Sequence, residues 1–288
     1  MHFVKARGIL NSSAGMNLYR GCLHGCIYCD ARSSCYQMNH VFEDIEVKEN
    51  APELLEAALK SRRKKGMIGT GSMGDPYIPL EKQLRLTRRC LEVILHQGFG
   101  ATVLTKSDLI LRDLELLRQI NHRAKAVAQI TLTTLDDKLS RLIEPNVCPS
   151  SRRVEVLREF QAAAVPTVVW FCPVLPFLTD TRENILSILE ACRDTGVKGV
   201  IWYGPGVTLR DGDREYFYAQ LDRKFPGLKE IYIRTYGGAY EVNSPKAPEL
   251  DRLFHETCEK SGLWHSNDQI FSYLHTLEEK EPQLSFFD

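Results

Sequence analysis

The chain has 288 residues, of which 43% are hydrophobic and 26% are charged, an ordinary balance for a protein that folds around a sizeable core. Its 37 lysines and arginines equal its 37 aspartates and glutamates, which argues against a protein that coats nucleic acid through overall charge, although a local basic patch is compatible with this balance. No apolar run approaches the ~20 residues that span a bilayer, and residues 1–7 lack the apolar core of a secretion signal. We therefore expect no membrane association.

The nine cysteines are an odd number, and most stand singly in apolar surroundings, as Cys90, Cys172, Cys192 and Cys258 do. A disulfide framework is therefore not expected. A reducing, cytoplasmic location fits this cysteine usage better.

Helical and strand-like segments alternate from about residue 50 to residue 203. Apolar helical faces are predicted at 54–59, 84–95, 110–120, 154–162 and 185–189. Ser107 is positioned to cap the third helix, and Asp180 with Glu183 resembles a capping box for the fifth. Buried strands are predicted near 16–19 and at 67–71, 102–105, 126–133, 167–171 and 199–203.

Repeated βα units of this size imply parallel strands joined by right-handed crossovers. The count of six strands favours an α/β fold with a partial (β/α)6 TIM-type barrel over a closed eight-stranded one. Functional side chains should then gather where the strands end and the loops begin.

The last part of the chain, residues 211–288, has a different pattern. It contains an aromatic-rich helix around 216–218, a strand-like segment at 231–233 and a helix around 250–258. We interpret residues 1–210 as the barrel core and residues 211–288 as a C-terminal α+β extension packed on it. The polar tail from 278 to 288 is expected to be disordered.

Three cysteines, Cys22, Cys26 and Cys29, lie within eight residues directly after the first predicted strand. Thiolates so close together in a reducing compartment indicate a soft metal or an iron–sulfur cluster. Three thiolates leave one iron of a [4Fe–4S] cube with open coordination, which a cluster needs if it is to bind a ligand. A zinc site is the alternative, with His24, Cys35 or His40 as the fourth ligand, but the second paired knuckle of zinc ribbons is absent.

The CxxxCxxC spacing, with an aromatic residue before the last cysteine, resembles the signature of the radical S-adenosylmethionine (SAM) superfamily. This resemblance implies a partial (β/α)6 barrel, a [4Fe–4S] cluster on the three cysteines and S-adenosylmethionine chelated by the open iron. It also implies reductive cleavage of the cofactor to a 5′-deoxyadenosyl radical, with a reductant such as flavodoxin or ferredoxin as partner. Tyr28 matches the aromatic position, which packs near the adenine.

Further segments resemble the spore photoproduct lyase-like branch of that superfamily and follow in order over most of residues 15–260. They are 16–22, 69–77, 105–108, 144–146, 173–177 and 207–211. This resemblance implies DNA or another nucleic acid as a possible substrate.

The second predicted strand ends in a loop that carries Gly71, Ser72 and Asp75. A hydroxyl and a carboxylate on the barrel rim could accept hydrogen bonds from the ammonium or ribose of the cofactor, and the glycine allows close backbone approach. A plain Gly-Asp-Pro turn is the alternative. The resemblance favours cofactor binding, because the family has a glycine-rich motif at the same strand end.

Four more residues are assigned to cofactor binding. Lys106 follows the third strand and resembles the lysine that relatives direct at the cofactor carboxylate; the alternative is a solvated surface lysine. Thr131, on the fourth strand, could line the barrel or simply fill the strand. Glu144 and Arg153 match a Glu-Pro…Arg pattern of relatives, and the alternative is a surface charge pair of little energetic value.

Other thiols and aromatic residues are weaker candidates. Cys35 lies six residues beyond Cys29 and is a candidate catalytic, radical-quenching thiol, or else a small buried residue. Cys148 and Cys172 could also supply a hydrogen atom. Six aromatic residues of the extension could stack on bases or could pack as core, and the latter is favoured: Tyr216, Phe217, Tyr218, Tyr232, Tyr236 and Tyr240.

Two positions depart from the pattern of spore photoproduct lyase. A tyrosine that follows the third cluster cysteine is Asp30 in this chain, and a cysteine that ends the second strand is Ser72. The O–H bond of a serine is too strong to replace a thiol readily in quenching a carbon radical. The sequence therefore predicts a radical SAM enzyme with an unsettled substrate. The alternatives are a DNA repair lyase acting on thymine dimers by a different hydrogen path, and a non-enzymatic iron–sulfur or zinc protein.

Overall fold

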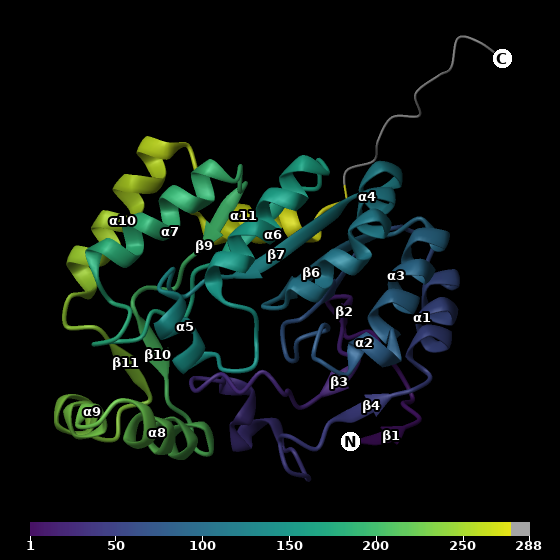
Figure 1. Ribbon diagram of the computed structural model, residues 1–288. Helices are drawn as coiled ribbons and strands as arrows, with labels where there is room; N and C mark the ends of the chain where they lie inside the picture. Colours follow the sequence, from purple (N-terminus) through teal and green to yellow (C-terminus); the bar gives the residue numbers. More distant parts are fainter. Residues whose placement is uncertain (278–288) are drawn as a thin grey trace.

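The computed structural model of the chain describes residues 1–277. Its centre is a six-stranded sheet with helices along its outer side (Figure 1). Each strand is parallel to its neighbours. The strands follow in chain order across the sheet: β2 (Gly15–Met16), β5 (Met67–Thr70), β6 (Gly100–Thr105), β7 (Ala126–Thr131), β8 (Thr167–Trp170) and β9 (Gly199–Ile201). The predicted α/β fold with a partial six-stranded barrel is confirmed.

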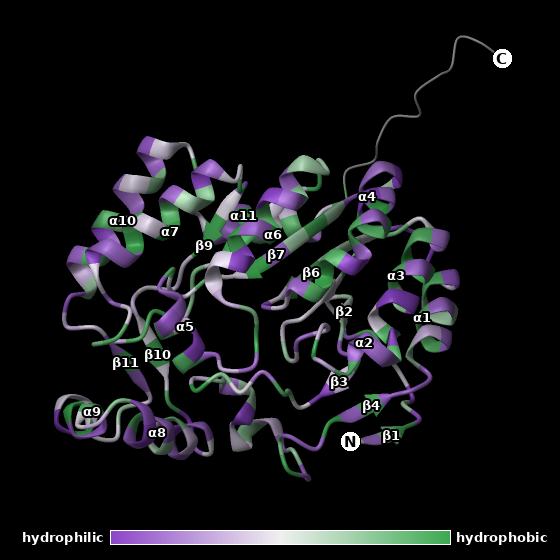
Figure 2. Cartoon of the chain, viewed as in Figure 1, coloured by the Kyte–Doolittle hydropathy of each residue, from purple (hydrophilic) through white to green (hydrophobic). Residues whose placement is uncertain are grey.

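Helices connect each strand to the next and turn their apolar faces to the sheet, as the hydropathy colouring shows (Figure 2). In the first crossover Leu55 and Leu59, four residues apart on one helical face, are fully buried. In chain order the helices are α1 (Ala51–Lys60), α2 (Glu81–Leu84), α3 (Leu86–Gln97), α4 (Leu114–Arg123), α5 (Asp137–Ile143), α6 (Ser150–Ala162) and α7 (Arg182–Asp194).

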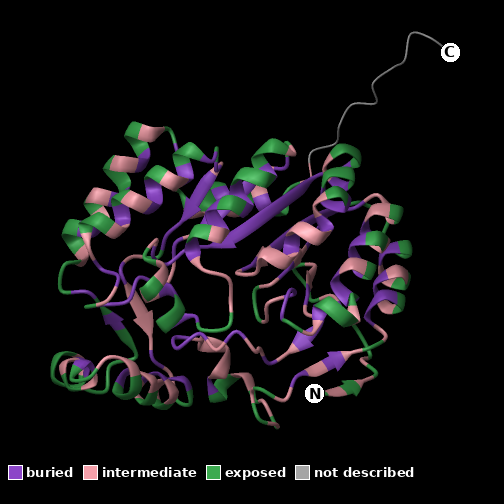
Figure 3. Cartoon of the chain, in the orientation of Figure 1, coloured by how far each residue is buried: buried purple, intermediate pink, exposed green. Residues whose placement is uncertain are grey.

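Strand β7 runs through the middle of the molecule, and all six of its residues are buried (Figure 3). Its neighbours β6 and β8 pair with it on both edges. A parallel strand covered on both faces favours a nearly continuous apolar run over an alternating one, which is why this segment could be recognised in the sequence.

The first predicted strand, at 16–19, is divided between two sheets. Met16 pairs with Thr70 in the central sheet, whereas Tyr19 pairs with Val47 in a second sheet of order β1-β4-β3. The elements of this second sheet are β1 (His2–Val4), β3 (Tyr19–Arg20) and β4 (Glu46–Lys48). The chain therefore leaves the barrel before it reaches the three cysteines.

The C-terminal part contributes a two-stranded antiparallel sheet and four helices: β10 (Gly206–Thr208), α8 (Asp213–Lys224), α9 (Leu228–Tyr236), β11 (Glu241–Asn243), α10 (Ala247–Ser261) and α11 (Asn267–His275). The helices predicted around 216–218 and 250–258 are confirmed. The strand predicted at 231–233 is wrong, because this segment is helix α9. Leu228 and Tyr232, four residues apart, are buried on one face of it, and a three-residue apolar run does not distinguish that face from a strand.

The predicted helix caps are confirmed in one case and displaced in the other. Ser107 accepts a hydrogen bond from the Leu109 N–H at 3.2 Å, and it caps the 3-10 helix η3 (Asp108–Asp113) that leads into α4. Helix α7 is capped by Thr181 and not by Asp180. The Asp180 carboxylate instead accepts from the Ser244 hydroxyl at 2.5 Å, a partner 64 residues away that no local pattern indicates.

A second apolar core lies between the C-terminal helices and the cysteine loop. Phe217 and Tyr232 are fully buried in it, and Tyr218 and Tyr236 pack against it. These four aromatic residues therefore pack as core, as the sequence favoured, whereas Tyr240 is 46% exposed. Among residues 1–277 no helix combines the length and the apolar character needed to cross a membrane. The prediction for the tail at 278–288 lies outside the described residues.

Candidate active site

The three cysteines lie on the loop that follows β3, and two glycines give this loop its tight path. Gly21 and Gly25 have φ of 93° and 68°, in the left-handed region that favours glycine. A Cβ on Gly21 would come within 2.4 Å of the carbonyl oxygen of Phe42. The turn before the first cysteine therefore depends on glycine for both conformation and space.

The thiols of Cys22, Cys26 and Cys29 line one wall of a cavity of about 830 Å³. All three are free, and Cys26 is the most buried of them. Burial raises the pKa of each thiol, that of Cys22 to about 12, while the positive charge of Lys106 acts in the opposite direction. A thiol that burial keeps protonated loses its proton when it binds a metal centre, because the positive charge of the metal stabilises the thiolate.

The cavity opens at the carboxyl ends of the barrel strands, where the fold is expected to keep its functional side chains. Nine of the twelve residues assigned from the sequence line it. They are Cys22, Cys26, Tyr28, Cys29, Gly71, Ser72, Asp75, Lys106 and Thr131. Cys35, Glu144 and Arg153 are not among its lining residues.

Asp75 is held in place by protein groups on both carboxylate oxygens. Its Oδ1 accepts from the Thr105 hydroxyl at 2.7 Å and from the Tyr77 N–H at 2.8 Å, and its Oδ2 accepts from the Lys106 N–H at 2.9 Å. The buried His24 places its Nδ1 3.4 Å from Oδ2. Asp75 therefore ties the ends of β5 and β6 to the cysteine loop.

Lys106 is half-buried at the end of β6, so the alternative of a solvated surface lysine is wrong. Burial acts to lower its pKa, but the neighbouring acidic groups of Cys26, Glu144 and Asp75 outweigh burial, and the pKa of Lys106 is raised. Its Nζ lies 5.8 Å from the centroid of the Tyr28 ring. The cavity therefore contains a firmly protonated ammonium group.

Behind the cavity wall, Glu144 and Arg153 form an ion pair 2.5 Å apart whose side chains are 0% and 1% exposed. The alternative of a surface charge pair is therefore wrong. Tyr28 donates its O–H to Glu144, and Arg153 donates to the carbonyls of Thr131 and Cys148 at 3.0–3.1 Å. The pair thus fixes the ring of Tyr28, which lies between Cys26 and Cys29 in the sequence.

Several lining residues were not assigned from the sequence: Tyr36, Trp170, Tyr203, Thr208, Arg210, Glu241 and Asn243. The ends of β8 and β9 contribute Trp170 and Tyr203, which the rule about strand ends could have identified. Cys172, a possible hydrogen-atom donor from the sequence, also lines the cavity beyond β8. No local signal indicates Glu241 or Asn243, because the pairing of β10 with β11 brings them to the cavity.

Cys35, the predicted catalytic thiol, is exposed and lies on η2 (Ser34–Tyr36), which follows η1 (Asp30–Arg32). Its Sγ is 3.2 Å from an Nη of Arg210 and 3.3 Å from the Ser33 hydroxyl. Arg210 in turn lies 3.1 Å from Asp30. Cys35 is therefore near the cavity rim through Arg210, without lining the cavity.

The thiols of Cys22, Cys26 and Cys29 fit an iron–sulfur cluster with one open iron better than they fit a zinc ion. Of the three possible fourth ligands for zinc, Cys35 lies outside the cavity lining and His40 lies beside His2 and Glu46. His24 lines the cavity, but its Nδ1 faces Asp75. The three thiols share one wall, and the cavity beside them has room for a ligand of cofactor size.

Residues 16–183 match the family model of the Radical SAM superfamily, more than half of the chain. The chain belongs to this superfamily.

Among the relatives found, an uncharacterized protein of Mycobacterium tuberculosis is 29% identical over 234 residues, which cover 77% of this chain and 66% of that protein. An uncharacterized protein of Methanocaldococcus jannaschii is 32% identical over 172 residues, which cover 59% of this chain and 63% of that protein. The chain thus matches slightly less than two thirds of the length of these two relatives.

The fold is similar to that of spore photoproduct lyase. A variant of that enzyme with bound dinucleoside spore photoproduct superposes with a TM-score of 0.66 at 13% identity, covering 91% of this chain and 80% of the lyase. A second variant, with bound AdoMet and the same dinucleoside, gives a TM-score of 0.59. At this level of identity the likeness concerns the fold.

Proposed function

We propose that this chain is a radical SAM enzyme in which Cys22, Cys26 and Cys29 hold a [4Fe–4S] cluster and the adjoining cavity binds S-adenosylmethionine. One observation carries the proposal: three thiols of a single loop line one cavity at the carboxyl ends of the barrel strands. Membership of the superfamily supports assigning these thiols to an iron–sulfur cluster. Its substrate is left open.

When bound, a cluster reduced by a donor such as flavodoxin or ferredoxin supplies the electron that cleaves S-adenosylmethionine to methionine and a 5′-deoxyadenosyl radical. The residues of the chain bind and orient the reactants. Lys106 presents an ammonium group to the cofactor carboxylate, a charge-assisted contact in a partly desolvated wall. Asp75 keeps the Gly71–Ser72 turn in contact with β6, and the Tyr28 ring, fixed by Glu144, offers an apolar face.

Gly71 allows the turn at the end of β5 to approach β6 closely. Gly71 has φ of 104°, and a Cβ there would come within 2.1 Å of the Leu104 carbonyl oxygen. The turn at the end of β5 can therefore stay against β6 only with glycine at this position. Its Ser72 hydroxyl is left at the cavity, where we assign it to cofactor binding.

The far wall of the cavity supports binding of a polar, partly aromatic substrate. Trp170 and Tyr203 offer ring faces with centroids 6.4 Å apart, and Arg210 and Glu241 offer opposite charges. These residues come from β8, β9 and the β10–β11 region, which we propose to be the substrate side. We further propose that residues 211–288 form an extension to a barrel core of residues 1–210, because its helices pack against the cysteine loop through the second core.

A DNA repair lyase that acts on thymine dimers is the second candidate. Ser72 argues against the hydrogen path of spore photoproduct lyase, but the Cys172 thiol lines the same cavity from the end of β8. Burial raises the pKa of Cys172 to about 12, so this thiol keeps its proton and can donate a hydrogen atom to a carbon radical. The fold similarity to a lyase with bound dinucleoside supports testing this substrate first.

The deciding experiment is anaerobic reconstitution followed by iron and sulfide counts and an assay for 5′-deoxyadenosine with dithionite. We expect four irons per chain by the cubane stoichiometry and cofactor cleavage. Cys22→Ala, Cys26→Ala and Cys29→Ala should each lose both, whereas Cys90→Ala, at a buried cysteine outside the cavity lining, should keep both. A full cubane with no 5′-deoxyadenosine would favour a non-enzymatic iron–sulfur protein. Turnover of the dinucleoside spore photoproduct would favour the lyase.

A further inference from the structure

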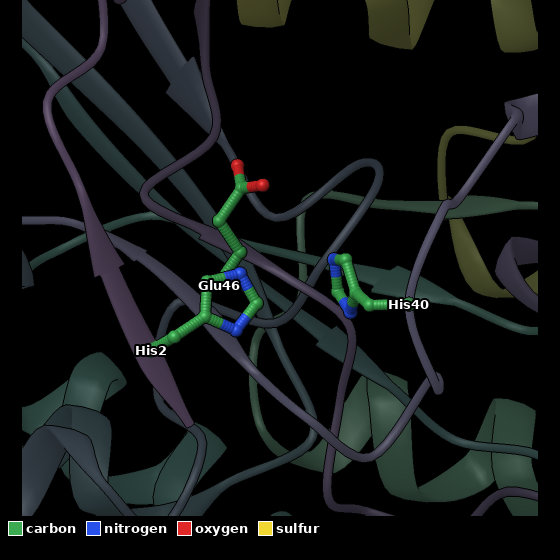
Figure 4. Close-up of side chains that lie close together, drawn as sticks. All are labelled: His2, His40 and Glu46. Atoms are coloured by element: carbon green, nitrogen blue, oxygen red, sulfur yellow. The ribbon is translucent and has the colours of Figure 1, made fainter.

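A second group of potential metal ligands lies in the small N-terminal sheet. One ring nitrogen each of His2 and His40 and one carboxylate oxygen of Glu46 all lie within 4.8 Å of one another. His2 comes from β1, His40 from the loop after η2, and Glu46 from β4 (Figure 4). Strand β1 and the nearby segment from His40 to Glu46 thus bring together two imidazoles and one carboxylate.

The hydrogen bonds of the two histidines determine which nitrogen is available. His2 Nδ1 is 3.0 Å from the Asp44 carboxylate, and His40 Nδ1 is 3.0 Å from the carbonyl of Val41. Since both partners can only accept, each Nδ1 carries the proton and each Nε2 keeps its lone pair in the neutral ring. Histidines that bind metals characteristically donate their second N–H to a carboxylate or a backbone carbonyl in this way.

The available donor atoms have no other partner in the described part of the chain. His40 Nε2 is buried and makes no hydrogen bond there. The Glu46 carboxylate forms no ion pair or hydrogen bond with any residue in the range 1–277, although Arg20 and Lys48 are near it. A buried imidazole nitrogen without a partner is costly to leave unsatisfied, and a cation shared with the neighbouring Glu46 carboxylate would satisfy it.

We propose that His2, His40 and Glu46 form a binding site for a divalent transition-metal ion of the Zn²⁺ class. Two imidazoles and one carboxylate are a recurrent zinc ligand set that leaves a fourth position for water. Donors at bonding distance from zinc stand roughly 3.3 Å apart in a tetrahedron, so each pair must close by about 1.5 Å at most. Half-buried side chains can make this adjustment.

The site has a structural consequence near the cysteine loop. The His40 loop also carries Phe42, whose carbonyl oxygen packs against Gly21, directly before Cys22. Glu46 lines a second cavity of about 350 Å³, which shares Ala31, Tyr36 and Met73 with the large one. A bound metal would therefore fasten the loop that supports the start of the cysteine loop to β1 and β4.

The test uses the full chain without a polyhistidine tag, with its cysteines loaded with iron and sulfide. Zinc content is measured by mass spectrometry after equilibration with Zn²⁺ and a competing chelator, and Co²⁺ serves as a spectroscopic substitute. We expect one tightly bound zinc per chain and a Co²⁺ spectrum without thiolate charge-transfer bands. His40→Gln and Glu46→Gln should each weaken binding by 100-fold or more, and Asp44→Asn by about tenfold.

The matched control is His255→Gln. His255 and His265 also stand close together, with ring centroids 5.2 Å apart, but no carboxylate completes a three-ligand group with them in residues 1–277. This variant should bind zinc like the unaltered chain. Zinc that persists in His40→Gln and Glu46→Gln, or that disappears when Cys22, Cys26 and Cys29 are replaced by serine, would overturn the proposal. The serine variant also separates this site from the cluster, because it should keep its zinc even if no cluster forms.

Discussion

Glu144 and Arg153 form an ion pair 2.5 Å apart in the interior of the protein, and neither side chain is more than 1% exposed. The Tyr28 hydroxyl donates to the same carboxylate, so the pair contacts a residue of the cysteine loop. Burial acts to raise the pKa of Glu144, but the positive charges of Arg153 and Lys106 outweigh it and the pKa is lowered. The carboxylate is thus ionised, and its partners hold it in place.

The first prediction concerns the stability that depends on this pair. Glu144→Gln leaves the Arg153 guanidinium buried without its counter-charge, and such a loss typically costs about 3–5 kcal/mol. We expect a decrease of this size in the free energy of unfolding, measured by urea denaturation of the cluster-free protein. Glu190→Gln is the control, because Glu190 forms an exposed pair with Arg193 and should cost less than about 1 kcal/mol.

The double variant Glu144→Met with Arg153→Met adds a second arm to this test. It removes both charges and should recover a large part of the lost stability, since a buried pair can be replaced by apolar side chains of similar size. If Glu144→Gln costs no more than Glu190→Gln, the pair does not stabilise the fold. Tyr28 would then be positioned by its packing alone.

The sequence was sufficient for the order of the barrel elements and for the cysteine loop. Strand β7 is buried on both faces and therefore carries a mostly apolar sequence, and the cysteine spacing is itself a local pattern. Segments of marginal length were less predictable. The apolar run at 231–233 fits one buried face of α9 as well as it fits a strand. The long-range contacts of Tyr232, whose hydroxyl donates to the Pro176 carbonyl at 2.8 Å, lie outside any local pattern.

The same limit applies to the candidate site. Lys106 follows a strand and could be assigned from position, but its burial among Cys26, Glu144 and Asp75 depends on three separate segments. Glu241 reaches the cavity through pairing of β11 with β10, and no motif around Glu241 in the sequence indicates this position. Local pattern identifies residues on strand ends, and long-range pairing decides which other residues join them.

The second prediction concerns the pH dependence of stability. Asp213 is buried at the start of α8, and burial together with the charge of Asp30 raises its pKa to about 6. Because this folded-state pKa exceeds the ordinary value of 3.8, the folded protein binds the proton more tightly than the unfolded chain does. The stabilising effect of the proton is complete below 3.8 and is lost as the pH rises through about 6.

Asp213→Asn removes this titration. We expect the variant to be more stable than the unaltered chain by about 1 kcal/mol at pH 8, with a gap that narrows as the pH falls through about 6 and closes below 3.8. Urea unfolding at several pH values measures it. Asp222→Asn, at an exposed residue paired with Lys229, should show no such pH-dependent gap. A gap that is constant with pH would contradict the assigned pKa.

The third prediction concerns cofactor affinity. Lys106→Met removes the ammonium group that we assign to the cofactor carboxylate, and a charge-assisted hydrogen bond of this kind contributes about 1.5–3 kcal/mol. The dissociation constant for S-adenosylmethionine should therefore rise by about 10- to 100-fold. Equilibrium binding to the reconstituted, unreduced protein measures it. Lys64→Met, in an exposed segment after α1, should bind the cofactor normally, and equal affinities in the two variants would contradict the role of Lys106.

The fourth prediction distinguishes Cys172 from Cys35 as the thiol that meets the bound reactants. Maleimides attack thiolates, so the exposed Cys35 should be modified quickly and the half-buried, protonated Cys172 slowly. S-adenosylmethionine should slow the modification of Cys172 further, because only Cys172 of the two lines the cavity. Peptide mass spectrometry of the reconstituted protein measures both rates.

Cys148 is the matched control, since it is also half-buried but does not line the cavity, and its rate should not depend on the cofactor. Protection of Cys35 with no change at Cys172 would instead favour the exposed thiol, and would mean that the segment around η2 closes over the cavity when the cofactor binds. Cys172→Ala should keep the cluster and cofactor cleavage under either outcome. A donor thiol acts on the substrate radical, after cleavage, so its loss should instead reduce the yield of product in which hydrogen has been returned to carbon.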